Sequence, residues 1–331
     1  MRFHVLQRLL RDWFLAGMIL AVVLAALFPD FGSTGGPMHA DVVANVGIFL
    51  VFFLHGLGLS VERMVAGLTR WRLHLLVQAF TFGVFPLLWL LLDATAGRWL
   101  PADLSLGFLY LCAVPSTISS SVAMMGLARG NVAGAIFNAS LSSLLGIVLT
   151  PLLVGLLART TGQSLSFADA VLKLAGLLLL PLVLGQLLRP LLGGWFARYK
   201  PYTNVFDRLV ILVLVYASFC DSVESGLFTR YGGGLLAVTL GGVALLLAVV
   251  LFLTTTAARW AGFDKEDEIA AVFCGSKKTL ASGVPMARLL FGAHPGLGLI
   301  VLPLMFYHQL QLIVCSVLAE RYAARGGGQA P

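Results

Sequence analysis

The sequence predicts an all-α polytopic membrane protein with ten transmembrane helices in two inverted five-helix repeats. Three observations carry this prediction: the composition, apolar runs that recur along the chain, and a match between its two halves. Hydrophobic residues make up 59% of the 331 positions and charged residues only 11%, which is outside the usage of soluble globular proteins. The apolar runs have about twenty residues, the length at which a helix crosses roughly 30 Å of hydrocarbon. The alternating pattern of a membrane barrel is absent.

The ten predicted spans are separated by connections that carry Gly, Pro and charge, such as Leu27–Asp41 and Arg189–Arg208. The spans cover roughly residues 12–29, 41–60, 72–94, 105–128, 131–158, 166–190, 204–226, 233–258, 266–291 and 295–320. If both ends are cytoplasmic, the inside segments hold fifteen of the 22 Lys and Arg residues, against four outside. This bias predicts a protein of the plasma (bacterial inner) membrane with both termini in the cytoplasm. Lys173, Lys277 and Lys278 lie within spans.

The two halves of the chain match when one is shifted by 162 positions. Cys112–Gly130 then falls on Cys274–Gly292 with seven of nineteen residues identical, and Ser60–Glu62 falls on Ser222–Glu224. Two matches at one offset indicate an ancient duplication. Because five spans are an odd number, the second copy enters the membrane upside down, as is typical of secondary transporters. The predicted repeats are residues 1–160 and 163–331.

Spans four and nine, the two matched segments, are poor as continuous helices. Pro115 and Pro285 each remove a backbone donor, and glycines weaken span nine further. Interrupted segments at corresponding positions of two halves indicate a binding site, where carbonyls and hydroxyls hold cations and half-helix N-termini face anions. We expect unwound backbone near Ser116–Ser121 and Ser276–Ser282. The candidate binding residues there are Ser116, Thr117, Ser119, Ser120, Ser121, Ser276, Lys277, Lys278, Thr279 and Ser282.

The two adjacent lysines lie close to the membrane midplane. If span nine begins near Ile269, Lys277 is about 12 Å deep, since each helical residue rises 1.5 Å. Two lysines that face lipid at this depth would cost about 5–7 kcal/mol. Either they snorkel back to the cytoplasmic surface, or they face the protein interior or a cavity, and the cost favours the interior.

Other polar groups accompany this segment. His308, Gln309 and Gln311 in span ten either form hydrogen bonds between helices or line a cavity. The acidic run Asp264–Glu268 is expected to be a solvated cap at the N-terminus of span nine, with Glu268 alternatively paired to a lysine. The four cysteines lack disulfide or metal spacing and are expected to be reduced packing residues.

Cys112–Pro151 together with Phe273–Ala287 resembles the bile acid:sodium symporter family, most closely its divergent branch with a Gly-Ser-Lys-Lys ninth span. The resemblance covers essentially the whole chain, and the Ala-Arg-Gly-Asn turn after span four is specific to it. It implies ten helices in which spans four and nine cross at their breaks. It also implies sodium-coupled uptake of bile acids or other organic anions by alternating access. The implied core is residues 72–158 and 233–320, and the implied panel is residues 12–60 and 166–226.

The ninth span departs from the pattern of that family. Sodium-coupled members carry a carboxylate and amide side chains beside the crossing, whereas Phe273–Lys278 holds no acid. A lysine ammonium is itself a cation and repels sodium in the same cavity. We therefore expect Lys277 rather than Lys278 to fill the space of the sodium ion, bonded to oxygens of Thr117 and Ser120. If that lysine releases its proton, a proton gradient drives uptake; if it stays charged, transport is uncoupled or exchange-like.

Spans three to five hold the other residues that the resemblance implicates. Gln78 resembles a sodium ligand of the family, and Ser120 and Ser121 stand where a Ser-Asn pair is typical. Two hydroxyl positions of the family are alanines here, with Asn138 and Ser140 adjacent. A sodium site at Ser120, Ser121 and Gln78 is therefore the alternative, so the coupling ion is Na⁺ or H⁺, and no other cofactor is expected.

Two further function classes stay open at this point. A channel or regulatory membrane protein would share the repeat, although broken helices favour alternating access. An intramembrane serine hydrolase would pair one of Ser119–Ser121 with His308, but nucleophile-elbow and metal-ligand spacings are absent. In a membrane protein the distribution of basic residues over the loops explains the net charge of +7, so no nucleic-acid partner is expected. The expected partners are the lipid bilayer and a small organic anion, with the chain a monomer or weak dimer.

Overall fold

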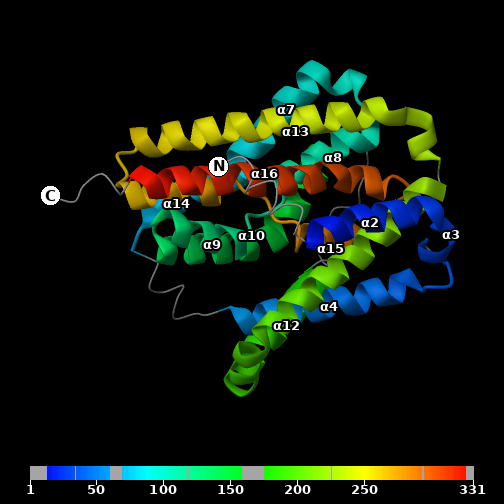
Figure 1. Cartoon of the computed structure of the whole chain (residues 1–331), viewed down its shortest axis with the longest axis horizontal. Coiled ribbons are helices and arrows are strands. Elements are labelled where there is room, and N and C mark those ends of the chain that lie inside the picture. The colour runs from blue at the N-terminus through cyan, green and yellow to red at the C-terminus, as the bar shows by residue number, and fades with distance from the viewer. Residues whose placement is uncertain are drawn as a thin grey trace.

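The computed structural model describes residues 13–33, 35–59, 69–117, 119–158, 175–224, 226–292 and 294–325. These residues form helices joined by short turns, with no strand among them, and the predicted all-α class is confirmed (Figure 1). The first half holds α2 (Trp13–Leu27), α3 (Pro29–Gly32), α4 (Ala40–Gly58), α6 (Trp71–Ala79), the π-helical turn η1 (Phe80–Val84), α7 (Phe85–Ala96), the 3-10 turn η2 (Gly97–Trp99), α8 (Ala102–Ala113), α9 (Ser119–Ala128) and α10 (Val132–Ala158). The second half holds the π-helical turn η4 (Ala175–Leu179), α12 (Leu180–Glu224), α13 (Leu227–Trp260), α14 (Lys265–Ser276), α15 (Gly283–Phe291) and α16 (Leu297–Arg325).

Many of these helices have the length and composition of membrane spans. Five stretches qualify on both counts: Trp71–Trp99, Val132–Ala158, Leu180–Glu224, Gly233–Trp260 and Leu297–Ala324. Their outward side chains are large and apolar, for example Leu245 and Phe252, which are 65% and 69% exposed. Apolar surface of this extent is typical of a membrane-facing protein. The chain is an integral membrane protein.

Where the structure describes the predicted spans, helices occupy them, with one difference between spans six and seven. The sequence predicts a connection over Arg189–Arg208, whereas the structure continues helical hydrogen bonding through it as part of α12. Pro190 and Pro201 each remove a backbone donor and bend the helix. The connection is therefore a bent helix instead of a loop. Residues 159–174, which include Lys173, lie outside the described residues.

The contacts of α12 with α4 show that the chain reverses at this bend. Before it, the Gln186 amide donates to the carbonyls of Gly56 and Leu59 at 3.0 and 2.6 Å. After the bend, Oδ1 of Asp207 lies 3.7 Å from Nε2 of His55. A straight helix would separate Gln186 and Asp207 by about 30 Å, at 1.5 Å per residue. Both reach the same end of α4 because α12 folds back.

The described helices fall into two groups. α2 and α4 pack on α12, whereas α8, α13 and α14 pack with α16 or with one another. In Figure 1 the first group lies at the lower right, and α13 and α16 run side by side above it. We call the first group the panel and the second the core, after the predicted domains. The domain boundaries and the inverted repeat stay predictions.

The helices of the panel approach to backbone contact. A Cβ atom built at Gly56 would lie 2.2 Å from the carbonyl oxygen of Leu182, and one at Gly185 would lie 2.2 Å from that of Phe53. Small residues permit this approach between membrane helices, where packing drives association. The absence of a side chain at Gly56 and Gly185 therefore sets the spacing of α4 and α12.

Gly185→Ala is expected to destabilise the protein by about 1–3 kcal/mol, because the added methyl group overlaps a backbone carbonyl. The midpoint of thermal unfolding in detergent measures the effect. Gly194→Ala on the same helix is the matched control, since a Cβ there meets no described atom within 4 Å. Alanine at 194 should preserve or raise stability. Equal destabilisation by both substitutions would contradict the packing interpretation.

Candidate functional site

The helices of spans four and nine are interrupted, α8 giving way to α9 and α14 to α15. In Figure 1 the half-helices α9 and α14 lie toward one end of the molecule. Pro115 accounts for the first break, because it lacks an N–H and forces the residue before it, Val114, into an extended conformation (φ −70°, ψ 154°). Lys277 is also extended (φ −94°, ψ 149°). The predicted interruptions are present, but Ser119–Ser121 form the first turn of α9, because proline acts on the residues before it.

The two breaks bond to each other in a reciprocal way. The hydroxyl of Ser116 donates to the carbonyl of Cys274 at 2.7 Å. The ammonium of Lys278 donates to the carbonyl of Cys112 at 2.9 Å. The repeat offset of 162 positions carries Ser116 onto Lys278 and Cys112 onto Cys274, so these two bonds are equivalent in the two halves. This pair of bonds supports the predicted repeat and holds the breaks together at a crossing.

Other open carbonyls of the breaks also find donors. Buried backbone carbonyls need partners, and helix C-termini leave several without an intrahelical donor. The donors are the Thr150 hydroxyl to Ala113 O (2.9 Å), the Thr279 N–H to Pro115 O (3.0 Å) and the Tyr307 hydroxyl to Ser276 O (2.7 Å). Thr150 and Tyr307 belong to α10 and α16, the helices that follow each broken pair. α10 and α16 therefore supply hydrogen-bond donors to carbonyls that the two breaks leave open.

Lys278 is fully buried at the crossing. Its ammonium donates to the carbonyls of Thr81, Cys112 and Val114 at 2.8, 2.9 and 2.8 Å. It also lies 4.0 Å from the ring centroid of Phe85, a cation–π distance. The Lys278 side chain is thus turned into the protein interior and is surrounded by groups that stabilise its charge.

Lys277 is also fully buried, but its surroundings are poorer in oxygen. Its ammonium donates to the carbonyl of Ser120 at 3.0 Å and lies 2.9 Å from the sulfur of Met124. The ring of Phe273 lies 5.2 Å away. Within the described part of the chain, neither lysine has a carboxylate at ion-pair distance. The alternative in which both lysines snorkel to the surface is wrong for this structure, because both ammonium groups lie within the core.

Side chains of α16, the predicted span ten, form hydrogen bonds with the backbone of Lys278. The Gln311 side chain accepts from the Lys278 N–H at 2.8 Å and donates to the Lys278 carbonyl at 2.7 Å. Nδ1 of His308 lies 3.0 Å from the Gln311 amide nitrogen and 3.4 Å from the Lys278 carbonyl. His308 and Gln311 therefore form hydrogen bonds between helices, one of the two predicted roles.

Gln309 faces the panel instead. Its amide nitrogen lies 3.9 Å from the sulfur of Met18 in α2. Its buried Oε1 atom has no hydrogen-bond partner among the described residues. A polar side chain at the boundary between core and panel is compatible with the other predicted role, the lining of a cavity.

The predicted sodium ligands lie on helices around the crossing. The Gln78 amide donates to the main-chain and side-chain oxygens of Asn138 at 3.2 and 3.4 Å, and its buried Oε1 has no partner among the described residues. The Ser120 hydroxyl donates to that of Thr117 at 3.4 Å. Ser121 is buried beside the thiol of Cys274 in α14.

Three of the remaining predicted residues, Ser140, Ser276 and Ser282, are buried. Ser140 lies on α10, and Ser282 stands directly before α15, with exposures of 4% and 8%. The hydroxyl of Ser276 donates within α14, to the Val272 carbonyl at 2.6 Å. The side chain of Ser119 lies outside the described residues. No cluster of three His, Cys, Asp or Glu side chains suited to a metal occurs in the described ranges.

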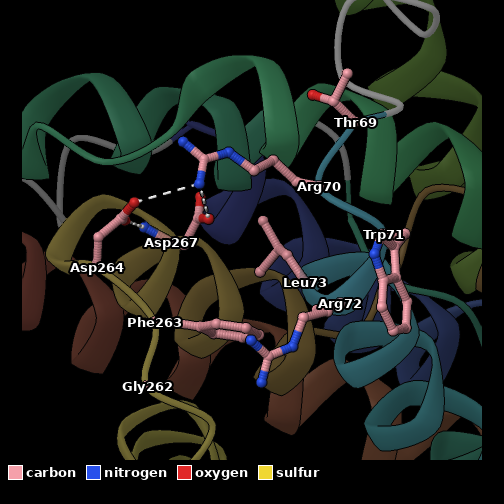
Figure 2. Close-up of a pocket in the computed structure, with 9 residues that line it drawn as sticks. All are labelled: Thr69, Arg70, Trp71, Arg72, Leu73, Gly262, Phe263, Asp264 and Asp267. Atoms are coloured by element: carbon pink, nitrogen blue, oxygen red, sulfur yellow. Dashed lines mark hydrogen bonds and ion pairs between the residues drawn. The ribbon is translucent and has the colours of Figure 1, made fainter.

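The N-termini of three core helices meet at one rim. Figure 2 shows Arg70 between Asp264 and Asp267, at 3.4 and 3.2 Å, beside a cavity of about 370 Å³. Asp264 caps α14 by accepting from the Asp267 N–H at 2.8 Å. Asn131 of the Ala-Arg-Gly-Asn turn donates to Asp267 at 2.7 Å. These contacts tie α6 and α10 to the N-terminus of α14, and the cavity lining does not include either lysine of the crossing.

The prediction of a solvated acidic cap holds for Asp264 and Glu266, which are exposed, but not for the other two acids. Asp267 and Glu268 are 4% and 5% exposed. Glu268 accepts from Lys265 at 2.8 Å and lies 3.3 Å from Arg259. The helix periodicity that turns one face of α14 inward also turns these two acids toward neighbouring helices, where basic partners compensate their burial.

A buried ion pair joins the two groups of helices far from this rim. Arg288 on α15 lies 2.9 Å from Asp221 on α12, and the side chains are 6% and 8% exposed. The next residue, Ser222, donates to the carbonyl of Pro295 at 3.0 Å and accepts from the Gly298 N–H at 2.9 Å. The sequence does not reveal this link, because no local pattern pairs residues that are 67 positions apart. The panel and the core are fastened together here.

A comparison with known protein families identifies the chain. The SBF-like CPA transporter family matches residues 12–324. The chain belongs to this family. As a member it is a membrane transporter, in agreement with the resemblance seen in spans four and nine.

Relatives cover almost the whole chain. It is 49% identical to "Uncharacterized protein PA2026" of Pseudomonas aeruginosa over 96% of this chain and 95% of that protein. It is 44% identical to "Putative symporter YfeH" of Escherichia coli over 94% of this chain and 92% of that protein. It is 33% identical to "Sodium/bile acid cotransporter 7" of Rattus norvegicus over 95% and 93%. The family membership therefore applies to the full architecture.

Arg288→Met is expected to cost about 3–5 kcal/mol of stability, because it leaves Asp221 as an unpaired buried charge. Thermal or denaturant unfolding in detergent measures the loss. The double variant Arg288→Met with Asp221→Leu should regain much of it, since neither charge then stays alone. Strictly additive losses in the double variant would show that the two side chains do not act as a pair.

Proposed function

We propose that this SBF-like transporter is a secondary active carrier of organic anions that works by alternating access. The observation that carries the proposal is the crossing, where two broken helices meet and two lysine side chains are buried. Ionisable groups at membrane depth are costly and mark substrate or ion pathways. Without a carboxylate partner among the described residues, the positive centre favours an anion as the mobile partner.

The substrate class that we propose is amphipathic carboxylates or sulfonates, such as bile acids or steroid conjugates. The name of the rat relative supports this class. The apolar helices around the crossing would accommodate the hydrophobic part of such a molecule, while its acid group would approach Lys277, whose ammonium has a single carbonyl partner. Gln309, at the boundary between core and panel, is the proposed polar contact on the panel side.

We propose further that transport does not require sodium. The carbonyl oxygens that converge at the crossing already hold a lysine ammonium, and a second cation there would be repelled. Lys277 has a single carbonyl partner, so its charged form is less stabilised than that of Lys278. It is therefore the group that can release and rebind a proton during the transport cycle. In that case a proton is the coupling ion and a proton gradient drives uptake. If Lys277 instead stays charged throughout, substrate transport is uncoupled or exchange-like.

Uptake of a labelled organic anion into proteoliposomes tests these proposals, with sodium and proton gradients imposed separately. Wild-type uptake should be equal with Na⁺ or K⁺ outside. Lys277→Gln should lower uptake roughly 10- to 100-fold, because a lost charge-assisted hydrogen bond costs about 1.5–3 kcal/mol. Lys265→Gln, outside the crossing, is the matched control.

Steep sodium activation of the wild type, unchanged in Lys277→Gln and Lys278→Gln, would reject the sodium-independent mechanism. In that case Ser120, Ser121 and Gln78 are the first residues to test as sodium ligands. No saturable uptake of any organic anion under either gradient would reject the carrier itself.

We also propose that the carrier resides in the plasma membrane with both termini in the cytoplasm. Trp260 and Trp99 stand at opposite ends of the core, 92% and 67% exposed. A cysteine at 260 should react with an impermeant maleimide only after the membrane is opened, and a cysteine at 99 should react in intact cells. The four native cysteines are buried and should stay silent. The reverse labelling pattern would invert the topology.

A further inference from the structure

The three carbonyls around Lys278 use its whole hydrogen-bonding capacity. A lysine ammonium has three N–H donors, and the three carbonyl oxygens lie at 2.8, 2.9 and 2.8 Å. The ring of Phe85 covers another side at 4.0 Å. The side chain is fully buried. We call the carbonyls of Thr81, Cys112 and Val114 the carbonyl cage.

The first carbonyl of the cage is free because of a proline in span three. In a regular helix the Thr81 carbonyl would accept from the Phe85 N–H, but in the π-helical turn η1 that N–H bonds to Phe80. The next residue in line is Pro86, which has no N–H. The Thr81 carbonyl therefore faces the interior without a backbone donor, and Lys278 supplies one.

The other two carbonyls of the cage come from the broken end of α8. The Ser116 N–H, which would bond to Cys112 in a continuous helix, bonds instead to the Ser142 hydroxyl at 2.9 Å. Val114 lies beyond the last helical turn. A helix C-terminus carries partial negative charge, so this end of α8 attracts a cation.

The backbone of Lys278 is fixed as firmly as its side chain. The Gln311 side chain bonds to both its N–H and its carbonyl, at 2.8 and 2.7 Å. Lys277, by contrast, has one carbonyl and one thioether contact. The expectation that Lys277 fills a cation position therefore fits Lys278 better, since the converging carbonyls surround Lys278.

We propose that the carbonyl cage is a binding site for a monovalent cation, and that this chain fills it permanently with the Lys278 ammonium. Carbonyl oxygens arranged in this way replace the hydration shell of small cations. The fixed cation links η1 to the broken end of α8, so the crossing assembles without an inorganic ion. The absence of sodium coupling rests on the proposed function, whereas the cage itself is a property of the fold.

Lys278→Ala tests the cage directly. Removal of the side chain empties the cage, and the unfolding midpoint should fall by roughly 5 °C or more. Ammonium or methylammonium chloride should then raise the midpoint, because a ligand that binds only the folded state stabilises it. Tetramethylammonium chloride at equal ionic strength should have no such effect, since it cannot donate hydrogen bonds. Sodium and potassium chloride, tested alongside, show whether the cage accepts metal ions.

Lys277→Ala, the neighbouring substitution, is the matched control and should show no difference between methylammonium and tetramethylammonium. A folded Lys278→Ala protein that gains nothing from any small cation relative to tetramethylammonium would overturn the proposal. The result does not depend on transport, so its failure is distinguishable from failure of the carrier hypothesis.

A measurement on the wild type covers the case in which Lys278→Ala does not fold. Native membranes are treated with acetic anhydride, and acetylation is quantified by peptide mass spectrometry. Lys278 should stay unmodified with and without an imposed proton gradient, while Lys265, whose side chain is 50% exposed, should react. Acetylation of Lys278 to the extent seen in the denatured protein would show that the ammonium leaves the cage, which overturns a fixed cation.

Discussion

The unwound backbone at the two breaks is the constraint on which the core is built. Carbonyls buried at membrane depth have no water to bond, so each one requires a donor from the protein. The donors come from the opposite break and from the helices that follow, α10 and α16. The relative placement of α8, α10, α14 and α16 therefore follows from hydrogen-bond demand as much as from apolar packing.

The same demand explains why a strongly apolar chain tolerates two adjacent lysines at its centre. Desolvation of an ammonium is expensive, but carbonyls at broken helix ends are expensive as well when they lack partners. At Lys278 the buried ammonium bonds to these carbonyls, so the hydrogen bonds offset both the desolvation of the charge and the loss of backbone partners. Lys277 obtains less compensation. This difference between neighbours gives one lysine a structural role and leaves the other for the proposed transport cycle.

Two polar links between panel and core start from neighbouring residues near the C-terminal end of α12. Arg288 bonds to Asp221, and Ser222 bonds to the segment before α16. The contacts at the rim around Asp267 lie within the core. In the proposed alternating-access cycle, movement of the core against the panel would have to break the first set and could leave the second intact.

The sequence alone determined the class, the helical segments that the structure describes and the two breaks, because these depend on local properties: apolar run length, and the effect of Pro115 on the residues before it. It also placed the lysines inside the protein from the cost of charge at depth. Only the tertiary structure decided which lysine meets the cage, since its three carbonyls lie 164, 166 and 197 positions away from Lys278. The bent connection within α12 and the Arg288–Asp221 pair were decided in the same way. Their partners depend on which helices lie side by side, and no local pattern encodes that.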